Sequence, residues 1–175
     1  MDDALQPIDL LVALKVAVDA PAVRSVRDLE EELGLSKSAV STSLRRLRGL
    51  GLVREGEEGR RVPKRMLLEC VEHVARWIAP ATVGDYELGL PTAHSEASVR
   101  AQLLGAEADT LVIPLPHGPV RGRAVSPIHP LAPAAAARDP RLHRMLALVD
   151  TFRVGRARER AIAARELRAC LAGDS

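Results

Sequence analysis

Residues 25–48 read SVRDLEEELGLSKSAVSTSLRRLR, and this stretch contains the start and end signals of two short helices. Ser25, followed three residues later by Asp28, has the spacing of a capping box, which marks the beginning of a helix. Gly34 supplies the left-handed conformation that ends a helix, and Ser36 is placed to cap the next one. The sequence therefore predicts two helices joined by a tight turn.

The second of these helices, residues 37–48, has two chemically different faces. Val40, Leu44 and Leu47 recur at helical spacing and predict an apolar stripe that packs inward. The other face carries short hydroxyls and long cations, namely Lys37, Ser38, Ser41, Thr42, Arg45 and Arg46. These side chains suit the DNA major groove, where hydroxyls reach phosphates or base edges and arginine grips guanine. We therefore expect this helix, with Ser36 at its start, to bind DNA.

Residues 52–62 predict a β-hairpin, because two short β-prone stretches flank a turn-rich tip. Flexible cations in and after such a hairpin are expected to contact phosphates, and the chain offers Arg54, Arg60, Arg61 and Lys64. Glu57 and Glu58 stand at the tip, where their charge argues against deep insertion into the minor groove.

Residues 33–41 (LGLSKSAVS) and 47–53 (LRGLGLV) resemble bacterial winged helix-turn-helix transcription regulators of the broad MarR-like kind. The resemblance covers roughly the first 75 residues. It implies a winged helix-turn-helix fold, in which residues 52–62 form the wing, and double-stranded DNA as the partner.

Charge is unevenly distributed along the first 65 residues, although the whole chain has a net charge of only +2. Residues 33–65 contain nine Lys and Arg against three Glu, a net charge of +6. Residues 1–32 contain three Lys and Arg against eight acids, a net charge of −5. Such polarisation presents a positive face to phosphates and turns an acidic face away from them. The pattern favours DNA binding over a merely solvated helical surface.

The composition indicates a globular protein with room for one generous domain or two small ones in its 175 residues. Its core must come from aliphatic side chains, because Trp77, Tyr86 and Phe152 are the three aromatic residues. There is no apolar run of 18 residues and no secretion signal, and two cysteines are too few for a disulfide framework. We expect a cytoplasmic protein that does not contact a membrane.

The pattern of elements predicts an α+β, mainly α, fold in two parts. A winged helix-turn-helix domain, residues 1–79, opens with a helix from about 7 to 19 and closes with a linking helix from 63 to about 79. An α+β domain, residues 80–175, follows. Its predicted elements are a helix at 95–104, a hairpin of strands 110–113 and 120–125 turning at residues 117–118, and helices at 141–152 and 156–171.

The second half offers chemistry only in fragments. Cys70 and His73 lie at i and i+3 of the linking helix, but no other Cys and His pair recurs at ligand spacing, so a buried thiol beside a surface imidazole is the preferred interpretation. No phosphate-binding glycine loop, nucleophile elbow or carboxylate pair appears. We predict no catalytic residue, no metal site and no cofactor.

The last helix is rich in arginine, and residues 140–175 contain eight arginines against four acids. Three uses remain open for it: a solvated helix with internal ion pairs, a dimer or partner surface, and a second nucleic-acid contact. Its apolar seam, Ile162, Leu167 and Leu171, is left either to a partner or to the helix at 141–152.

Together these features predict a homodimeric, sequence-specific repressor whose C-terminal half serves dimerisation, a protein partner or a small-molecule effector. Dimerisation is expected because one recognition helix buries little surface, and two half-sites one DNA turn apart multiply specificity. Two alternatives remain. One is an antitoxin-like regulator whose C-terminal half neutralises a protein partner, and the other is an enzyme formed by that half.

Overall fold

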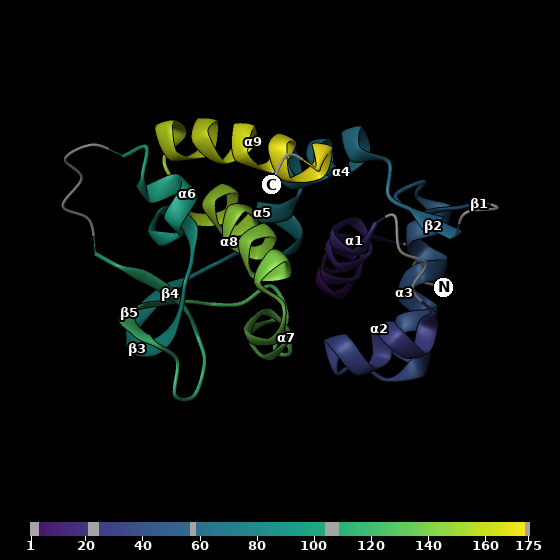
Figure 1. The fold of residues 1–175 in the computed structure, drawn as a ribbon, viewed down its shortest axis with the longest axis horizontal. Helices are drawn as coiled ribbons and strands as arrows, with labels where there is room; N and C mark the ends of the chain where they lie inside the picture. The colour runs from purple at the N-terminus through teal and green to yellow at the C-terminus, as the bar shows by residue number, and fades with distance from the viewer. Residues whose placement is uncertain (1–3, 21–24, 57–58, 104–108, 174–175) are drawn as a thin grey trace.

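The computed structural model describes residues 4–20, 25–56, 59–103 and 109–173 and shows helices surrounding two small sheets (Figure 1). Helices account for 58% of the residues and strands for 16%, which confirms the predicted α+β, mainly α class. Within the described ranges, none of the helices is long and apolar enough to cross a membrane.

The first three helices are α1 (Pro7–Asp19), α2 (Val26–Leu33) and α3 (Lys37–Gly49), as the sequence predicts. The capping box before α2 is present, since the Asp28 amide donates to Ser25 Oγ over 3.1 Å and the Ser25 amide donates to Asp28 Oδ2 over 2.8 Å. Gly34 ends α2 at φ 69°, in the left-handed region, and Ser36 Oγ accepts from the Ala39 amide to start α3. Local sequence signals therefore set the turn between the two helices.

The predicted wing is confirmed as an antiparallel pair of strands, β1 (Arg54–Gly56) and β2 (Gly59–Arg61). Its tip, with Glu57 and Glu58, lies outside the described residues.

The linking helix is interrupted, so the prediction of one continuous helix over 63–79 is wrong. It consists of α4 (Lys64–His73) and a single turn, α5 (Ala75–Ile78), with Val74 between them at φ −114°. Ala75 is fully buried, and its small side chain lets α5 approach α8. The bend takes Trp77 off the predicted apolar face, and 74% of its surface is exposed.

The C-terminal sheet has three strands, β3 (Val83–Pro91), β4 (Leu111–Pro114) and β5 (Val120–Val125), and each pairs with both others. The predicted hairpin of 110–113 and 120–125 is wrong, because β4 and β5 run parallel and both are antiparallel to β3. Strand β3 was not predicted, since most of its side chains are exposed. Gly89 is where β3 meets both partners, and a Cβ there would collide with the Ile113 carbonyl.

The remaining elements are mostly helical. The predicted helix at 95–104 is shorter and consists of a 3₁₀ turn, η1 (Ala93–Ser95), and α6 (Ala97–Arg100). The helices predicted at 141–152 and 156–171 are confirmed within two residues as α8 (Pro140–Val154) and α9 (Ala157–Ala172). One more short helix, α7 (Ala132–Arg138), was not predicted.

Helix α1 lies between α3 of the N-terminal half and α8 of the C-terminal half (Figure 1). Its apolar residues face both neighbours, and Leu11, Val12 and Leu14 have no exposed surface. A helix with apolar residues on more than one side must be covered on each of those sides. One hydrophobic core therefore runs from α1 to α9. The division at residue 79 stays a prediction about roles, because the described core crosses it.

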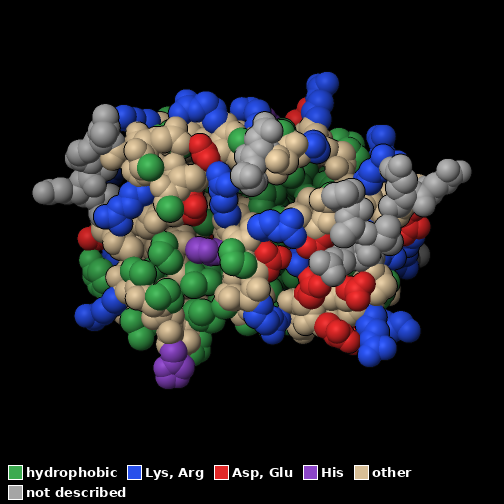
Figure 2. Space-filling model, in the orientation of Figure 1, with side chains coloured by type: hydrophobic (Ala, Val, Ile, Leu, Met, Phe, Trp, Pro, Cys, Tyr) green, Lys and Arg blue, Asp and Glu red, His purple; other side chains and the backbone are tan. Residues whose placement is uncertain are grey.

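Helix α9 covers α8 with its apolar seam, since Ile162, Leu167 and Leu171 are all buried within the chain. The sequence left this apolar seam either to a partner or to the helix at 141–152, and the structure shows that the helix covers it. Arginines of these helices pair with acids on other elements, as in Arg144 with Glu166 and Arg168 with Glu72, each at 2.8 Å. Figure 2 shows basic side chains along the edge formed by α9.

A buried ion pair within α8 connects this helix to Thr92, which follows β3, and to Ala79, which follows α5. Arg153 Nη1 lies 2.6 Å from Asp150 Oδ1, and both side chains are at most 3% exposed. Asp150 Oδ2 also accepts from the Thr92 hydroxyl at 2.6 Å, and Arg153 Nε donates to the Ala79 carbonyl at 2.6 Å. The network satisfies polar groups that could not reach water and fixes α8 against two other segments.

We expect Arg153→Met to destabilise the fold by about 3–5 kcal/mol, because Asp150 would remain buried without its counter-charge. Urea denaturation followed by circular dichroism measures this free energy of unfolding. Arg158→Met, at an exposed position of α9, is the matched control and should change it by less than about 0.5 kcal/mol. Equal effects of the two substitutions would contradict a structural role for the pair.

Candidate nucleic-acid interface

Helix α3 turns the predicted apolar stripe inward and its polar face outward. Val40, Leu44 and Leu47 are at most 2% exposed and pack in the core beside α1 and α2. The side chains exposed on the opposite face are Lys37, Ser38, Ser41 and Arg45, with Thr42 half-buried beside them. The structure thus gathers five predicted contact residues on one surface, at the amino end and middle of the helix.

The amino end of α3 is suited to an anion. Its first turn contains no acidic residue, and free amide N–H groups at a helix start carry partial positive charge. Ser36 Oγ accepts from the Ala39 amide at 3.2 Å and lies 3.1 Å from Ser38 Oγ. Ser36 therefore has a capping role that the sequence predicts, and its exposed position keeps it on the candidate interface.

Arg46 lies away from this surface. Its guanidinium forms two 2.8 Å bonds with the carboxylate of Asp9 on α1, and Asp9 has no exposed side-chain surface. A paired, planar contact of this kind is stronger than a single charged bond. We therefore assign Arg46 to holding α3 on α1 and leave it out of the proposed DNA contacts. Sequence reasoning missed this pair because the two residues are 37 positions apart.

The wing is joined to α3 by one carboxylate. Glu55 Oε1 lies 3.0 Å from Arg48 Nη1 at the end of α3 and 3.3 Å from Arg60 Nε on β2. Glu55 thus neutralises part of the positive charge at the base of the wing and links the wing to the end of α3.

The other predicted cations of the wing region are exposed. Arg54 on β1, Arg61 at the end of β2 and Lys64 at the start of α4 all present their side chains at the surface. Acidic residues, by contrast, gather on α2, as Figure 2 shows. The polarity predicted from the charge pattern is therefore present in the helix-turn-helix, with acids on α2 and cations on α3 and the wing.

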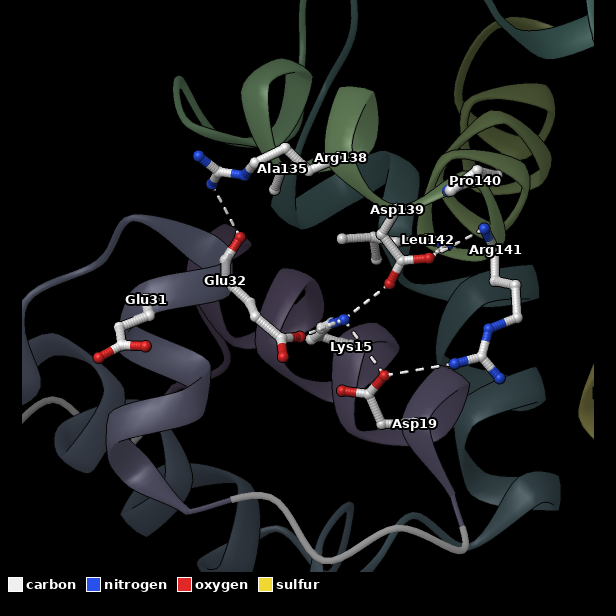
Figure 3. A pocket seen from close by; sticks show the side chains of 10 residues that line it. All are labelled: Lys15, Asp19, Glu31, Glu32, Ala135, Arg138, Asp139, Pro140, Arg141 and Leu142. Carbon is white, nitrogen blue, oxygen red and sulfur yellow. Dashed lines mark hydrogen bonds and ion pairs between the residues drawn. The ribbon is translucent and has the colours of Figure 1, made fainter.

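A second polar cluster holds the helix-turn-helix against the C-terminal half (Figure 3). Lys15 on α1 is only 4% exposed, and its Nζ lies 2.6 Å from Asp139 Oδ2, 2.5 Å from Glu32 Oε2 and 3.2 Å from Asp19 Oδ1. These carboxylates belong to the residue before α8, to α2 and to α1 itself. One ammonium group thus joins three segments, two of which are more than 100 residues apart.

Ionisation strengthens this cluster. Burial opposes the charged form of Lys15, but hydrogen bonds with Asp139, Glu32 and Asp19 outweigh it and raise the pKa of Lys15. Burial likewise acts to raise the pKa of Asp139, yet the bond from Lys15 and two backbone amides lowers it overall. Both groups are therefore charged at neutral pH, and the attraction between them is retained there.

Cys70 is buried, and burial raises the pKa of its thiol to about 11. This thiol therefore does not contradict the prediction of no metal site. A neutral thiol is a poor metal ligand. Among the residues that the structure describes, no three His, Cys, Asp or Glu side chains form a group that could hold a metal ion.

Residues 19–55 match the profile of a family described as bacterial regulatory protein, arsR family. The matched segment contains α2, the turn and α3, and it ends within β1, so it includes the exposed face of α3. No curated protein and no solved structure matches the chain. The segment is therefore a helix-turn-helix regulatory domain of the winged DNA-binding type, and the narrower MarR-like resemblance stays a prediction.

We expect Lys15→Met to destabilise the protein by roughly 3–5 kcal/mol at neutral pH, since it leaves three carboxylates around an uncharged side chain. The raised pKa of Lys15 makes its contribution complete below pH 10.5 and lost as the pH rises further. The lowered pKa of Asp139 makes its contribution complete above pH 3.8 and lost as the pH falls further.

Unfolding free energies of the native protein and Lys15→Met should differ most between pH 3.8 and pH 10.5, and the difference should shrink below and above that range. Arg27→Met, which removes an exposed ion pair with Glu31, is the control and should show no such pH dependence. A constant difference at every pH would contradict the charge-based account.

Proposed function

We propose that the protein is a sequence-specific transcriptional regulator, a homodimeric repressor that places α3 in the DNA major groove and the wing on the phosphate backbone. The observation that carries this proposal is the exposed face of α3, where Lys37, Ser38, Ser41, Thr42 and Arg45 lie opposite a fully buried apolar stripe. The family match to residues 19–55 supports it, because that match includes this helix.

The roles of the side chains follow from their positions. Ser38, Ser41, Thr42 and Arg45 are the proposed base-reading residues, because they lie opposite the buried stripe in the N-terminal part and middle of α3, and the N-terminal part of a recognition helix contacts base edges. Ser36 and Lys37 at the helix start, and Arg54, Arg60, Arg61 and Lys64 around the wing, are the proposed phosphate contacts. Arg60 would then share its charge between Glu55 and a phosphate.

Combined Thr42→Ala and Arg45→Ala should weaken binding to the DNA that the native protein selects by about 1–3 kcal/mol for each base that is no longer read. Fluorescence anisotropy with labelled duplexes measures this affinity. Thermal stability should stay nearly unchanged, since neither side chain is in the core. Arg27→Ala, on the acidic helix α2, is the matched control and should leave DNA affinity at the native value. Unchanged affinity in the double variant would show that α3 is not the reader.

The homodimer is the second part of the proposal. A single recognition helix contacts few bases, and paired half-sites about one DNA turn apart raise specificity. The exposed apolar side chains Val74 and Trp77 of the interrupted linking helix, 36% and 74% exposed, support a contact there. Arg76 lies over the Trp77 ring at 5.2 Å, which leaves the other face of the indole for a partner.

We expect the native protein to sediment as a dimer at micromolar concentration and Trp77→Lys to shift it towards the monomer, because a second charge beside Arg76 cannot be buried in that contact. Sedimentation velocity gives the mass of both species. Tyr86→Lys, at an exposed aromatic on β3, is the control and should remain dimeric. A native monomer, or a dimeric Trp77→Lys variant, would contradict this interface.

The roles predicted for residues 80–175, dimerisation included, stay predictions. Those residues have no family match, and a protein partner or an enzymatic activity has no particular observation in its favour.

A further inference from the structure

A hollow of about 630 Å³ opens where four elements meet. It lies between the end of α1, the segment from β2 into α4, the start of α8 and the end of α9. Figure 2 shows hydrophobic side chains in a recess beside the C-terminal end of α9. A volume of this size is within the range of small-molecule sites, which is about 300–1,000 Å³. The hollow is therefore large enough for a ligand, and its lining indicates which kind.

The lining combines apolar side chains with positive charge. Its apolar side chains include Val18, Val62, Met145 and Leu171, supplied by all four elements. Its charged residues are four cations, Arg61, Lys64, Arg141 and Arg144, and no Asp or Glu is among the described residues that line it. An apolar floor with cations and no acid is complementary to an anion that carries an apolar body.

Arg144 is the most informative of these cations. Its Nη2 is paired with Glu166 at 2.8 Å, but its Nε is buried and has no hydrogen-bond partner among the described residues. A buried donor without an acceptor costs free energy, so a rotation of this partly exposed guanidinium towards an acceptor in the hollow that it lines would be stabilising. Arg141 stands beside it and makes a long, 3.6 Å contact with Asp19, and its mostly exposed guanidinium is able to turn towards a ligand.

We propose that this hollow binds a small amphipathic carboxylic acid, with the carboxylate on Arg144 and Arg141 and the apolar body on the floor. Arginine suits this role, because its planar fork of N–H groups matches the two oxygens of a carboxylate. The apolar body would be buried against side chains of both halves of the chain.

The same lining gives the ligand a route to DNA binding, and this step rests on the proposed function. Arg61 and Lys64 border the hollow and are also proposed phosphate contacts. A carboxylate bound beside them reduces the positive potential at both cations, so we expect the ligand to lower the affinity for DNA. By reciprocity, DNA must lower the affinity for the ligand by the same factor.

Decanoate is the probe for the first experiment, and isothermal titration calorimetry on the full-length protein without DNA is the measurement. Binding of decanoate, with no binding of decylamine and much weaker binding of decan-1-ol, supports the site. Arg144→Met should weaken decanoate binding by at least about tenfold, because it removes a charge-assisted bond. No binding of decanoate, or equal binding of decylamine, overturns the proposal.

Ala172→Trp provides a variant that keeps every charge. Ala172 lines the hollow from an exposed position at the end of α9, so a bulky side chain there fills the space without entering the core. It should abolish decanoate binding while leaving thermal stability near the native value. A folded Ala172→Trp variant with native decanoate affinity would overturn the proposed location.

The second experiment adds DNA and separates the two proposals. Decanoate should weaken DNA binding of the native protein and leave that of Ala172→Trp unchanged. If decanoate binds but the protein shows no affinity for DNA, the proposed function fails and the site stands. If Arg144→Met lowers DNA affinity and flattens its salt dependence while decanoate does not bind, the cations belong to the phosphate surface and the ligand site is overturned.

Discussion

Burial of helix α1 is the constraint on which the rest of the structure depends. The helix carries buried apolar residues on more than one side, so it needs a partner on each of them, and it packs against α3 on one and α8 on the other. Helix α3 and the C-terminal half are thus packed on the same small element. Any rotation of α1 would move the exposed face of α3 relative to α8 and α9. The two halves differ in their proposed roles, yet they share one core.

Three charged groups make this arrangement specific. Asp9 binds Arg46 and sets α3 on α1, Lys15 binds carboxylates from α2 and from the segment before α8, and Glu55 joins the end of α3 to the wing. Hydrophobic contact alone would let helices slide, whereas the ion pairs of buried Asp9 and Lys15 tolerate one geometry. The pair of Glu55 with Arg48 is about half exposed and contributes less. The hollow lies at the same junction, since Arg141 borders both it and the Lys15 cluster. A ligand in the hollow would therefore contact Ala17 and Val18 of α1 as well as the cations beside the wing.

The sequence predicts those parts of the structure that depend on neighbouring residues. Caps, a left-handed glycine and an apolar stripe specify α2 and α3, and they also predict the exposed face of α3. Contacts between distant residues were missed: nothing local pairs Asp9 with Arg46, so Arg46 appeared to be a DNA contact. Strand β3 was missed for a related reason, because its side chains do not alternate between buried and exposed and only its pairing with β4 and β5 makes it a strand. The break at Val74 likewise arises from packing of α5 on α8 rather than from a local signal.

The central claim is that α3 reads a DNA sequence, and the DNA that the protein retains from a sheared bacterial genome tests it most directly. The purified protein would be incubated with the fragments at physiological salt, and the bound DNA would be sequenced. Our account predicts a few strongly enriched fragments that share one motif, arranged as two half-sites about one helical turn apart. Retention of fragments without a shared motif, in proportion to their length, would contradict it, because only non-specific attraction to phosphate would remain.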